Sequence, residues 1–140
     1  MDFIQRFKER KIVSPTLDVK FGEFVLKVER FSQAEMSEAG RDSERMMRQR
    51  GLEPKVEDTQ DPKFITQQDR VGSLCCAVAP FVIRHLKGWT HKPVVGDEIP
   101  YSKENAQLML DAMTDVERAM LGLAYFAASD DDQKKMDKAA

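Results

Sequence analysis

The stretch "TLDVKFGEFVLKVERF", residues 16–31, decides the amino-terminal half of the fold. Polar and apolar residues alternate on both sides of Gly22-Glu23, and glycine at the first position of a two-residue turn is typical of a type II′ hairpin. Pairing the two arms around that turn gives three apolar pairs on one face, which are Phe21–Phe24, Val19–Leu26 and Leu17–Val28. We therefore expect a β-hairpin at 16–29 whose apolar face packs on other elements.

The length and composition indicate one globular domain. The chain has 140 residues, of which 41% are hydrophobic and 33% are charged, and its formal net charge is -2. This charge gives no general attraction to nucleic acid or to an anionic membrane, and we expect neither as a partner. We also find no signal peptide and no apolar run long enough to span a membrane. We place the domain at 1–129 and expect 130–140 to be a charged, flexible tail.

Helix start and stop signals divide most of the remaining chain. Two residue pairs have the spacing of capping boxes: Ser32 with Glu35, and Thr114 with Glu117. Ser102 is a single N-cap residue, and Asp61 is an N-cap residue followed by proline at the first helical position. The predicted helices are 33–50, 62–79, 103–113 and 115–128. Together with the hairpin they predict a mainly α (α+β) fold: a small helical domain with an N-terminal β-hairpin packed on the helices.

Two segments are ambiguous. Pro80 lacks a backbone N–H, so we expect the second helix to kink or end near Ala79, and residues 81–89 are compatible with a helix or a short strand. The last helix has an excess of apolar residues. We assign its packing face to the spaced residues Val116, Met120, Leu123, Ala124 and Ala127, which leaves Leu121, Tyr125 and Phe126 outside that face.

We find no catalytic, metal or cofactor site in the sequence. The soft metal ligands are Cys75, Cys76, His85 and His91, and adjacent cysteines do not have the spacing of zinc ligands. The common phosphate-binding, metalloprotease and hydrolase motifs are absent. We expect the cysteines in the core, a histidine at the surface, and a protein that is not an enzyme.

The surplus of apolar residues on the last helix favours a binding role. Methionine is flexible and polarisable, which suits a surface that receives apolar partners, although it also fills gaps in cores. We therefore predict a surface for a client protein or for self-association. It consists of Met120, Leu121, Tyr125 and Phe126, with Trp89 as a support.

The segment 88–104 carries a family resemblance. Gly88 and Trp89, followed by Gly96, Ile99, Pro100, Tyr101, Ser102 and Glu104, match a "GW" and a "G-x-x-[IV]-P-[FY]-[ST]-x-E" pattern. In this respect, and in the order of the hairpin and helices around it, the chain resembles the tail assembly chaperones of long-tailed (siphovirus-type) bacteriophages and prophages. From the residues alone, 87–105 reads as a connector between two packed elements, with Trp89 as the anchor of its turn.

The resemblance implies a non-enzymatic role in the cytoplasm of the host bacterium. Such chaperones bind the tape measure protein during tail assembly and are absent from the mature virion. Many also exist in a longer form, made by ribosomal frameshifting, that recruits the tail tube protein. Lys134 and Lys135 mark a possible frameshift position here. We expect a homo-oligomer. The alternative is a structural tail completion or head–tail joining protein of the virion.

Overall fold

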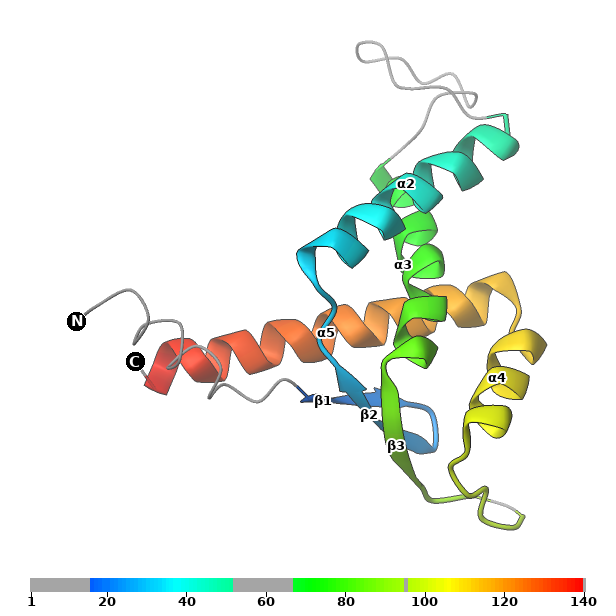
Figure 1. Ribbon diagram of the computed structural model, residues 1–140, viewed down its shortest axis with the longest axis vertical. Coiled ribbons are helices and arrows are strands. Elements are labelled where there is room, and N and C mark those ends of the chain that lie inside the picture. The colour runs from blue at the N-terminus through cyan, green and yellow to red at the C-terminus, as the bar shows by residue number, and fades with distance from the viewer. Residues whose placement is uncertain (1–15, 52–66, 95, 140) are drawn as a thin grey trace.

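The computed structural model describes residues 16–51, 67–94 and 96–139, and these form an α+β fold of four helices and a three-stranded antiparallel sheet (Figure 1). The predicted fold class is therefore confirmed. In chain order the elements are β1 (Thr16–Phe21), β2 (Phe24–Glu29), α2 (Gln33–Gln49), α3 (Gln67–Arg84), β3 (Leu86–His91), α4 (Lys103–Ala112) and α5 (Asp115–Ala139). The long helix α3 is central, since it packs against α2, α4 and α5.

The hairpin forms in the register that its alternation predicts. Leu17 pairs with Val28, Val19 with Leu26 and Phe21 with Phe24. The turn begins at Gly22, whose φ of 57° is the left-handed value that a primed hairpin turn requires at its first position. On the outer face, the Lys27 ammonium lies 2.6 Å from the Asp18 carboxylate. The inner face of the hairpin is buried, chiefly against α5, which confirms the prediction that it packs on helices.

Residues 81–89 are divided between a helix and a strand. The prediction that α3 ends near Ala79 is wrong, because the helix continues through Pro80 to Arg84. The extra turn buries Phe81 and Val82 almost completely. Their burial contributes about 1.5–3 kcal/mol each, which together offsets the roughly 3 kcal/mol that proline costs inside a helix. After a turn at His85, β3 then pairs with β2, with an irregularity between Lys27 and Val28.

The capping signals within the described residues are confirmed. At α2 the Ser32 hydroxyl accepts from the Glu35 N–H, and the Glu35 carboxylate accepts from the Ser32 N–H. The same reciprocal pair joins Thr114 and Glu117 before α5. The Ser102 hydroxyl caps α4 by accepting from Asn105 at 2.9 Å. The predicted start at Asp61-Pro62 lies outside the described residues.

Helix α5 is longer than the sequence indicated. We expected it to end near residue 128, but it continues to Ala139, so most of the segment assigned to a tail is helical. The extension has a specific contact with the hairpin end, because the Arg30 guanidinium forms an ion pair with the Asp132 carboxylate and donates to the Ser129 hydroxyl at 3.1 Å. Lys134 pairs with Asp130 one turn earlier, at 3.2 Å.

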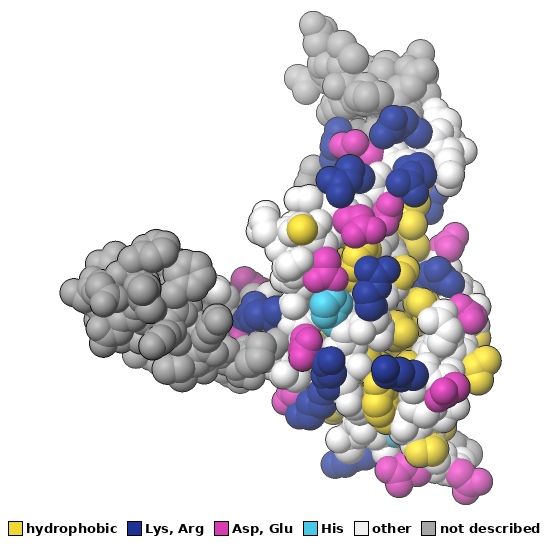
Figure 2. Space-filling view, in the orientation of Figure 1, with side chains coloured by type: hydrophobic (Ala, Val, Ile, Leu, Met, Phe, Trp, Pro, Cys, Tyr) yellow, Lys and Arg dark blue, Asp and Glu magenta, His cyan; other side chains and the backbone are white. Residues whose placement is uncertain are grey.

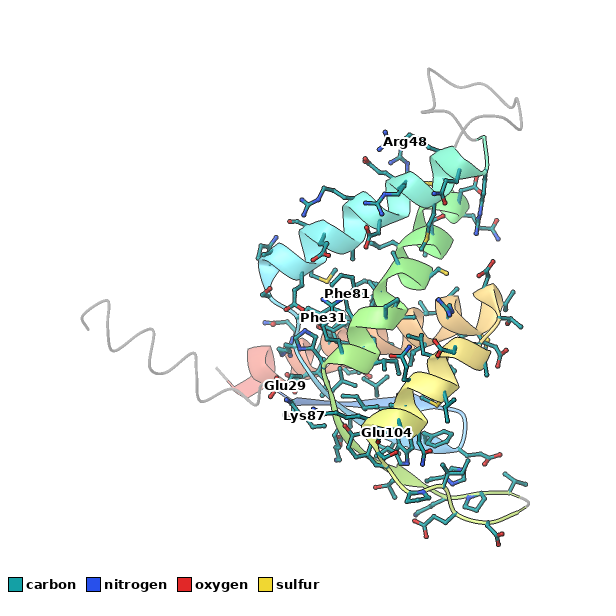
Figure 3. All side chains as sticks on the ribbon, turned by 45° about the vertical axis from the view of Figure 1, so that its right-hand side comes forward. Glu29, Phe31, Arg48, Phe81, Lys87 and Glu104 are labelled. Atoms are coloured by element: carbon teal, nitrogen blue, oxygen red, sulfur yellow. The ribbon has the colours of Figure 1, made fainter. Side chains whose placement is uncertain are left out.

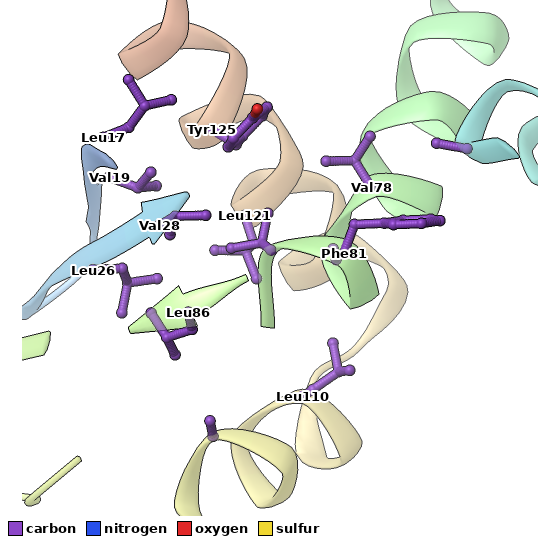
Figure 4. Packing of buried hydrophobic residues seen from close by; sticks show 14 residues of the cluster. Leu17, Val19, Leu26, Val28, Val78, Phe81, Leu86, Leu110, Leu121 and Tyr125 are labelled. Carbon is purple, nitrogen blue, oxygen red and sulfur yellow. The ribbon is translucent and has the colours of Figure 1, made fainter. Parts of the chain in front are cut away.

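The core lies where the inner face of the sheet meets α3 and α5 (Figure 4). Leu121 and Tyr125 of α5 point toward the hairpin residues Leu17, Val19 and Val28, and Val78 and Phe81 close the core from α3. Next to Leu121, α5 approaches the backbone of α3 closely at a glycine. A Cβ atom added to Gly122 would lie 2.0 Å from the Cys75 carbonyl oxygen, so only glycine allows this helix contact.

Candidate binding surfaces

Two of the residues predicted to form a binding surface belong to the core. Leu121 is fully buried and Tyr125 is 4% exposed. The Tyr125 hydroxyl also accepts a hydrogen bond from the Phe31 N–H at 3.1 Å, the two rings stack, and burial raises the pKa of the phenol. The assignment of Leu121 and Tyr125 to a surface is therefore wrong. These two residues hold α5 against the sheet.

The opposite side of α5 carries the exposed apolar residues. Val116, Met120 and Leu123 are 70%, 56% and 57% exposed, and Ala127 is also exposed. We call these four residues the α5 stripe. Of the predicted surface, Met120 is thus accessible. The spacing in the sequence predicts that the stripe packs on the core, and this prediction is wrong because the two faces of α5 are exchanged.

The spacing within the α5 stripe is that of a helix that packs on another helix. The successive stripe residues are four, three and four positions apart, from Val116 through Met120 and Leu123 to Ala127. This is the a/d spacing of coiled coils. A helix face of this kind pairs with an apolar face of a second helix. Gly122 gives the signal that sequence reasoning missed, because a glycine inside an apolar helix indicates close packing on the side where it lies.

Acidic residues lie at both ends of the α5 stripe. Asp115 and Glu117 lie on either side of Val116 at the start of the stripe, and Asp131 lies about one turn after its last residue. All three side chains are exposed. Two copies of the stripe packed against each other, parallel or antiparallel, would bring these carboxylates together at each end. The charges therefore disfavour self-pairing of the stripe and favour a helix with basic residues near its apolar face.

The other two members of the predicted surface, Phe126 and Trp89, are partly buried. Phe126 packs edge-on against Tyr125, with ring centroids 5.7 Å apart. Trp89 lies on β3, where its ring centroid is 5.1 Å from that of Phe24 and 5.2 Å from that of Tyr101. Their contacts are with the body of the protein, and the structure gives them a packing role.

Trp89 and His91 fasten the loop that follows β3. The Trp89 indole N–H donates to the Ile99 carbonyl oxygen at 2.9 Å, and the Ile99 N–H donates to His91 Nδ1 at 2.9 Å. His91 Nε2 donates to the Glu23 carboxylate at 3.0 Å. The turn within the loop includes Gly96, whose φ is 108°. The prediction of a connector anchored by Trp89 is confirmed, whereas the expected surface histidine is wrong for His91, which is 5% exposed.

The candidate metal ligands do not come together. Cys75 and Cys76 are buried free thiols on α3, and burial raises the pKa of both, which keeps them protonated. His85 donates to the Glu35 carboxylate and lowers the pKa of that group. Within the described ranges, no group of three histidine, cysteine or acidic side chains has the arrangement of a metal site.

Helix α2 presents a charged outer face at one end of the molecule (Figure 3). Arg45 lies 3.3 Å from Asp42, and Arg48 lies 3.8 Å from Glu44. These intrahelical pairs interleave positive and negative charge along the helix. The face is therefore that of a solvated helix.

Comparisons of the chain with protein-family models, with curated proteins and with solved structures gave no significant match. Among the described helices, none combines the length and apolarity that a membrane span needs. The geometry of the surfaces is therefore the main guide to function.

Proposed function

We propose that the protein is a phage tail assembly chaperone that binds a helical segment of the tape measure protein through the α5 stripe. The resemblance of residues 88–104 to that family suggests the role, and the stripe supplies a surface suited to it. This role is non-enzymatic and requires no catalytic residue, metal or cofactor. It would take place in the cytoplasm of the host bacterium, before the virion is complete.

The observation that carries the proposal is an exposed a/d stripe on a helix that is firmly held from behind. Leu121, Gly122 and Tyr125 fix α5 to the core, so Met120 and Leu123 are presented on a rigid element. Binding to such a surface costs little conformational entropy on the protein side. A long helical client would offer many matching apolar faces.

The size of the α5 stripe favours a reversible contact. Four aliphatic side chains present on the order of 300 Å² of apolar surface, whereas a stable protein interface buries about 800 Å² on each partner. A single contact would therefore be weak. Several copies bound along one client would together hold it strongly, which agrees with the expected oligomeric assembly.

A longer frameshifted form that recruits the tail tube protein is a second part of the proposal. Lys134 lies in α5, so a change of frame at Lys134 or Lys135 would replace the end of a helix that begins at the client surface. The gene sequence tests this part. A slippery run at these codons followed by an open frame supports it, and the absence of both removes it.

Co-expression tests the client. We expect the tape measure protein to stay soluble and to co-purify with the wild-type chain, and to be lost with Met120→Glu. The matched control is Thr90→Glu, which changes an exposed residue of β3. If Met120→Glu retains the client as well as the control does, the α5 stripe is not the binding surface. Detection of the chain in purified virions by mass spectrometry would instead support the structural tail or head–tail joining role.

A further inference from the structure

A second apolar surface lies between the end of α3 and α4. It is a groove of about 420 Å³, and its apolar lining includes Pro80, Ile83, Tyr101 and Ala106. Figure 2 shows apolar side chains gathered in a strip between these helices, with basic side chains beside it. The groove is separate from the α5 stripe, because none of the four stripe residues lines it.

The charges at the groove all have the same sign. Arg84 on α3 and Lys103 on α4 line it, and no aspartate or glutamate does. Within the described part of the chain neither cation has an ion-pair partner, whereas Lys27, Arg30 and Lys87 each lie beside a carboxylate. The Arg84 guanidinium rests over the Phe81 ring, 4.7 Å from its centroid, with its charge available to a further group. Carboxylates on an incoming segment would complement both cations.

We propose that this groove binds a short amphipathic helix of a partner protein in which aspartate or glutamate flanks the apolar residues. The lining residues Lys103, Ala106 and Gln107 occupy one face of α4, which suits the packing of a helix alongside. The α5 stripe has acidic residues at its ends and therefore favours a partner helix with basic residues. The chain thus has two helix-binding surfaces that discriminate between partners by sign, and this second surface does not depend on the client proposed above.

Two synthetic helices of equal length test the assignment. Both carry leucine at the a and d positions of two heptads and lack tryptophan, and one has glutamate and the other lysine at the flanking e and g positions. Trp89 is the single tryptophan of the chain and contacts Tyr101 of the groove, so its emission reports binding there. We expect the glutamate peptide to change the emission in a saturable way, with an affinity at least about tenfold higher than that of the lysine peptide.

Charge reversal provides the control. Arg84→Glu with Lys103→Glu should invert the preference, so that the lysine peptide binds more tightly than the glutamate peptide. The matched pair Arg41→Glu with Lys92→Glu makes the same change of charge at exposed residues outside the groove and should leave the preference unchanged. The proposal is overturned if the glutamate peptide does not bind, or if groove reversal leaves its affinity intact.

Two further measurements distinguish the groove from the α5 stripe and from a self-association site. The Met120→Glu variant should still bind the glutamate peptide, because Met120 does not line the groove. Loss of client binding in that variant and loss of peptide binding in the groove variant are therefore separate results. Sedimentation of the unliganded chain tests a second copy as the occupant. We expect the reversed groove variant to sediment as the wild type does. If the wild type self-associates and the groove variant does not, the groove is a self-association site and the heterologous partner is excluded.

Discussion

At the scale of single residues, Gly122 is the one described glycine at which an added Cβ would meet other atoms. Its missing side chain allows the α5 backbone to approach the Cys75 carbonyl, and a methyl group there would meet backbone atoms that cannot rotate away. A glycine inside an apolar helix indicates a close contact, but the sequence does not give its distance, and not every glycine in a helix packs closely. Gly40 of α2, for example, has nothing within 4 Å of the position that a Cβ would occupy.

We predict that Gly122→Ala lowers the free energy of unfolding by about 3 kcal/mol or more, because α3 and α5 must separate to admit the methyl group. Thermal unfolding followed by circular dichroism should show a decrease in Tm of roughly 10 °C. Gly40→Ala is the matched control and should leave the stability unchanged or raise it by about 0.5–1 kcal/mol. Equal Tm values for the two variants would show that the close contact is not present in solution.

Glu35 links the start of α2 to the end of α3. Its carboxylate accepts from His85 and from the Ser32 N–H, and these hydrogen bonds lower its pKa. A lowered pKa in the folded state means that the ionised carboxylate stabilises the fold at pH values above the ordinary pKa of a glutamate. This contribution disappears as the pH falls through the pKa of the folded state.

We therefore predict that Glu35→Gln, which keeps a side chain suited to the capping box, lowers Tm at pH 5. The difference from the wild type should shrink between pH 5 and pH 3 as the wild-type carboxyl becomes protonated. Melting curves at intervals over this range provide the measurement. A difference that stays constant down to pH 3 would contradict an ionised, hydrogen-bonded Glu35.

At the scale of elements, the sequence predicted the parts whose signals are local. The alternation around Gly22 defined the hairpin and its register, and the caps at Ser32, Ser102 and Thr114 located three helix starts. The errors came from tertiary packing. Helix α3 passes Pro80 because the next turn buries Phe81, and β3 forms because the edge of β2 is available to it.

The exchange of the two faces of α5 has the same cause. Two sets of residues on α5 are apolar, so periodicity alone does not select the buried set. One set is Leu121, Tyr125 and Phe126, and the other is Val116, Met120 and Leu123. The structure selects Leu121 and Tyr125 because Gly122, on that side, permits close contact with α3. The surface predicted from the sequence therefore included two core residues, Leu121 and Tyr125, beside the exposed Met120.

The assignment of the faces gives a direct prediction. Leu121→Asp places a charge in the fully buried core and should cost more than about 4 kcal/mol, enough to unfold most of the protein. Leu123→Asp, two residues further along the same helix, should change the stability by less than about 1 kcal/mol. Urea unfolding measures both variants. Similar losses of stability would mean that the stripe is packed in solution, and it would then be unavailable to a client.

At the scale of the whole molecule, the fold presents two unlike apolar surfaces. The core of sheet, α3 and α5 leaves the α5 stripe with acidic ends, and α4 forms with α3 a groove lined by Arg84 and Lys103. Of these two surfaces the sequence predicted only Met120 of the α5 stripe, because each surface consists of side chains that the core leaves uncovered. The arrangement suits a protein that brings helical partners together.

The central claim is that the tape measure protein lies against the α5 stripe, and crosslinking in cells tests it most directly. A photo-reactive amino acid would replace Leu123 of the stripe or, as a control, Thr90 of β3, both of which are exposed. The proposal predicts a covalent adduct with the tape measure protein from position 123 and none from position 90. Adducts from position 90 alone, or only adducts between two copies of the chain from position 123, would contradict it.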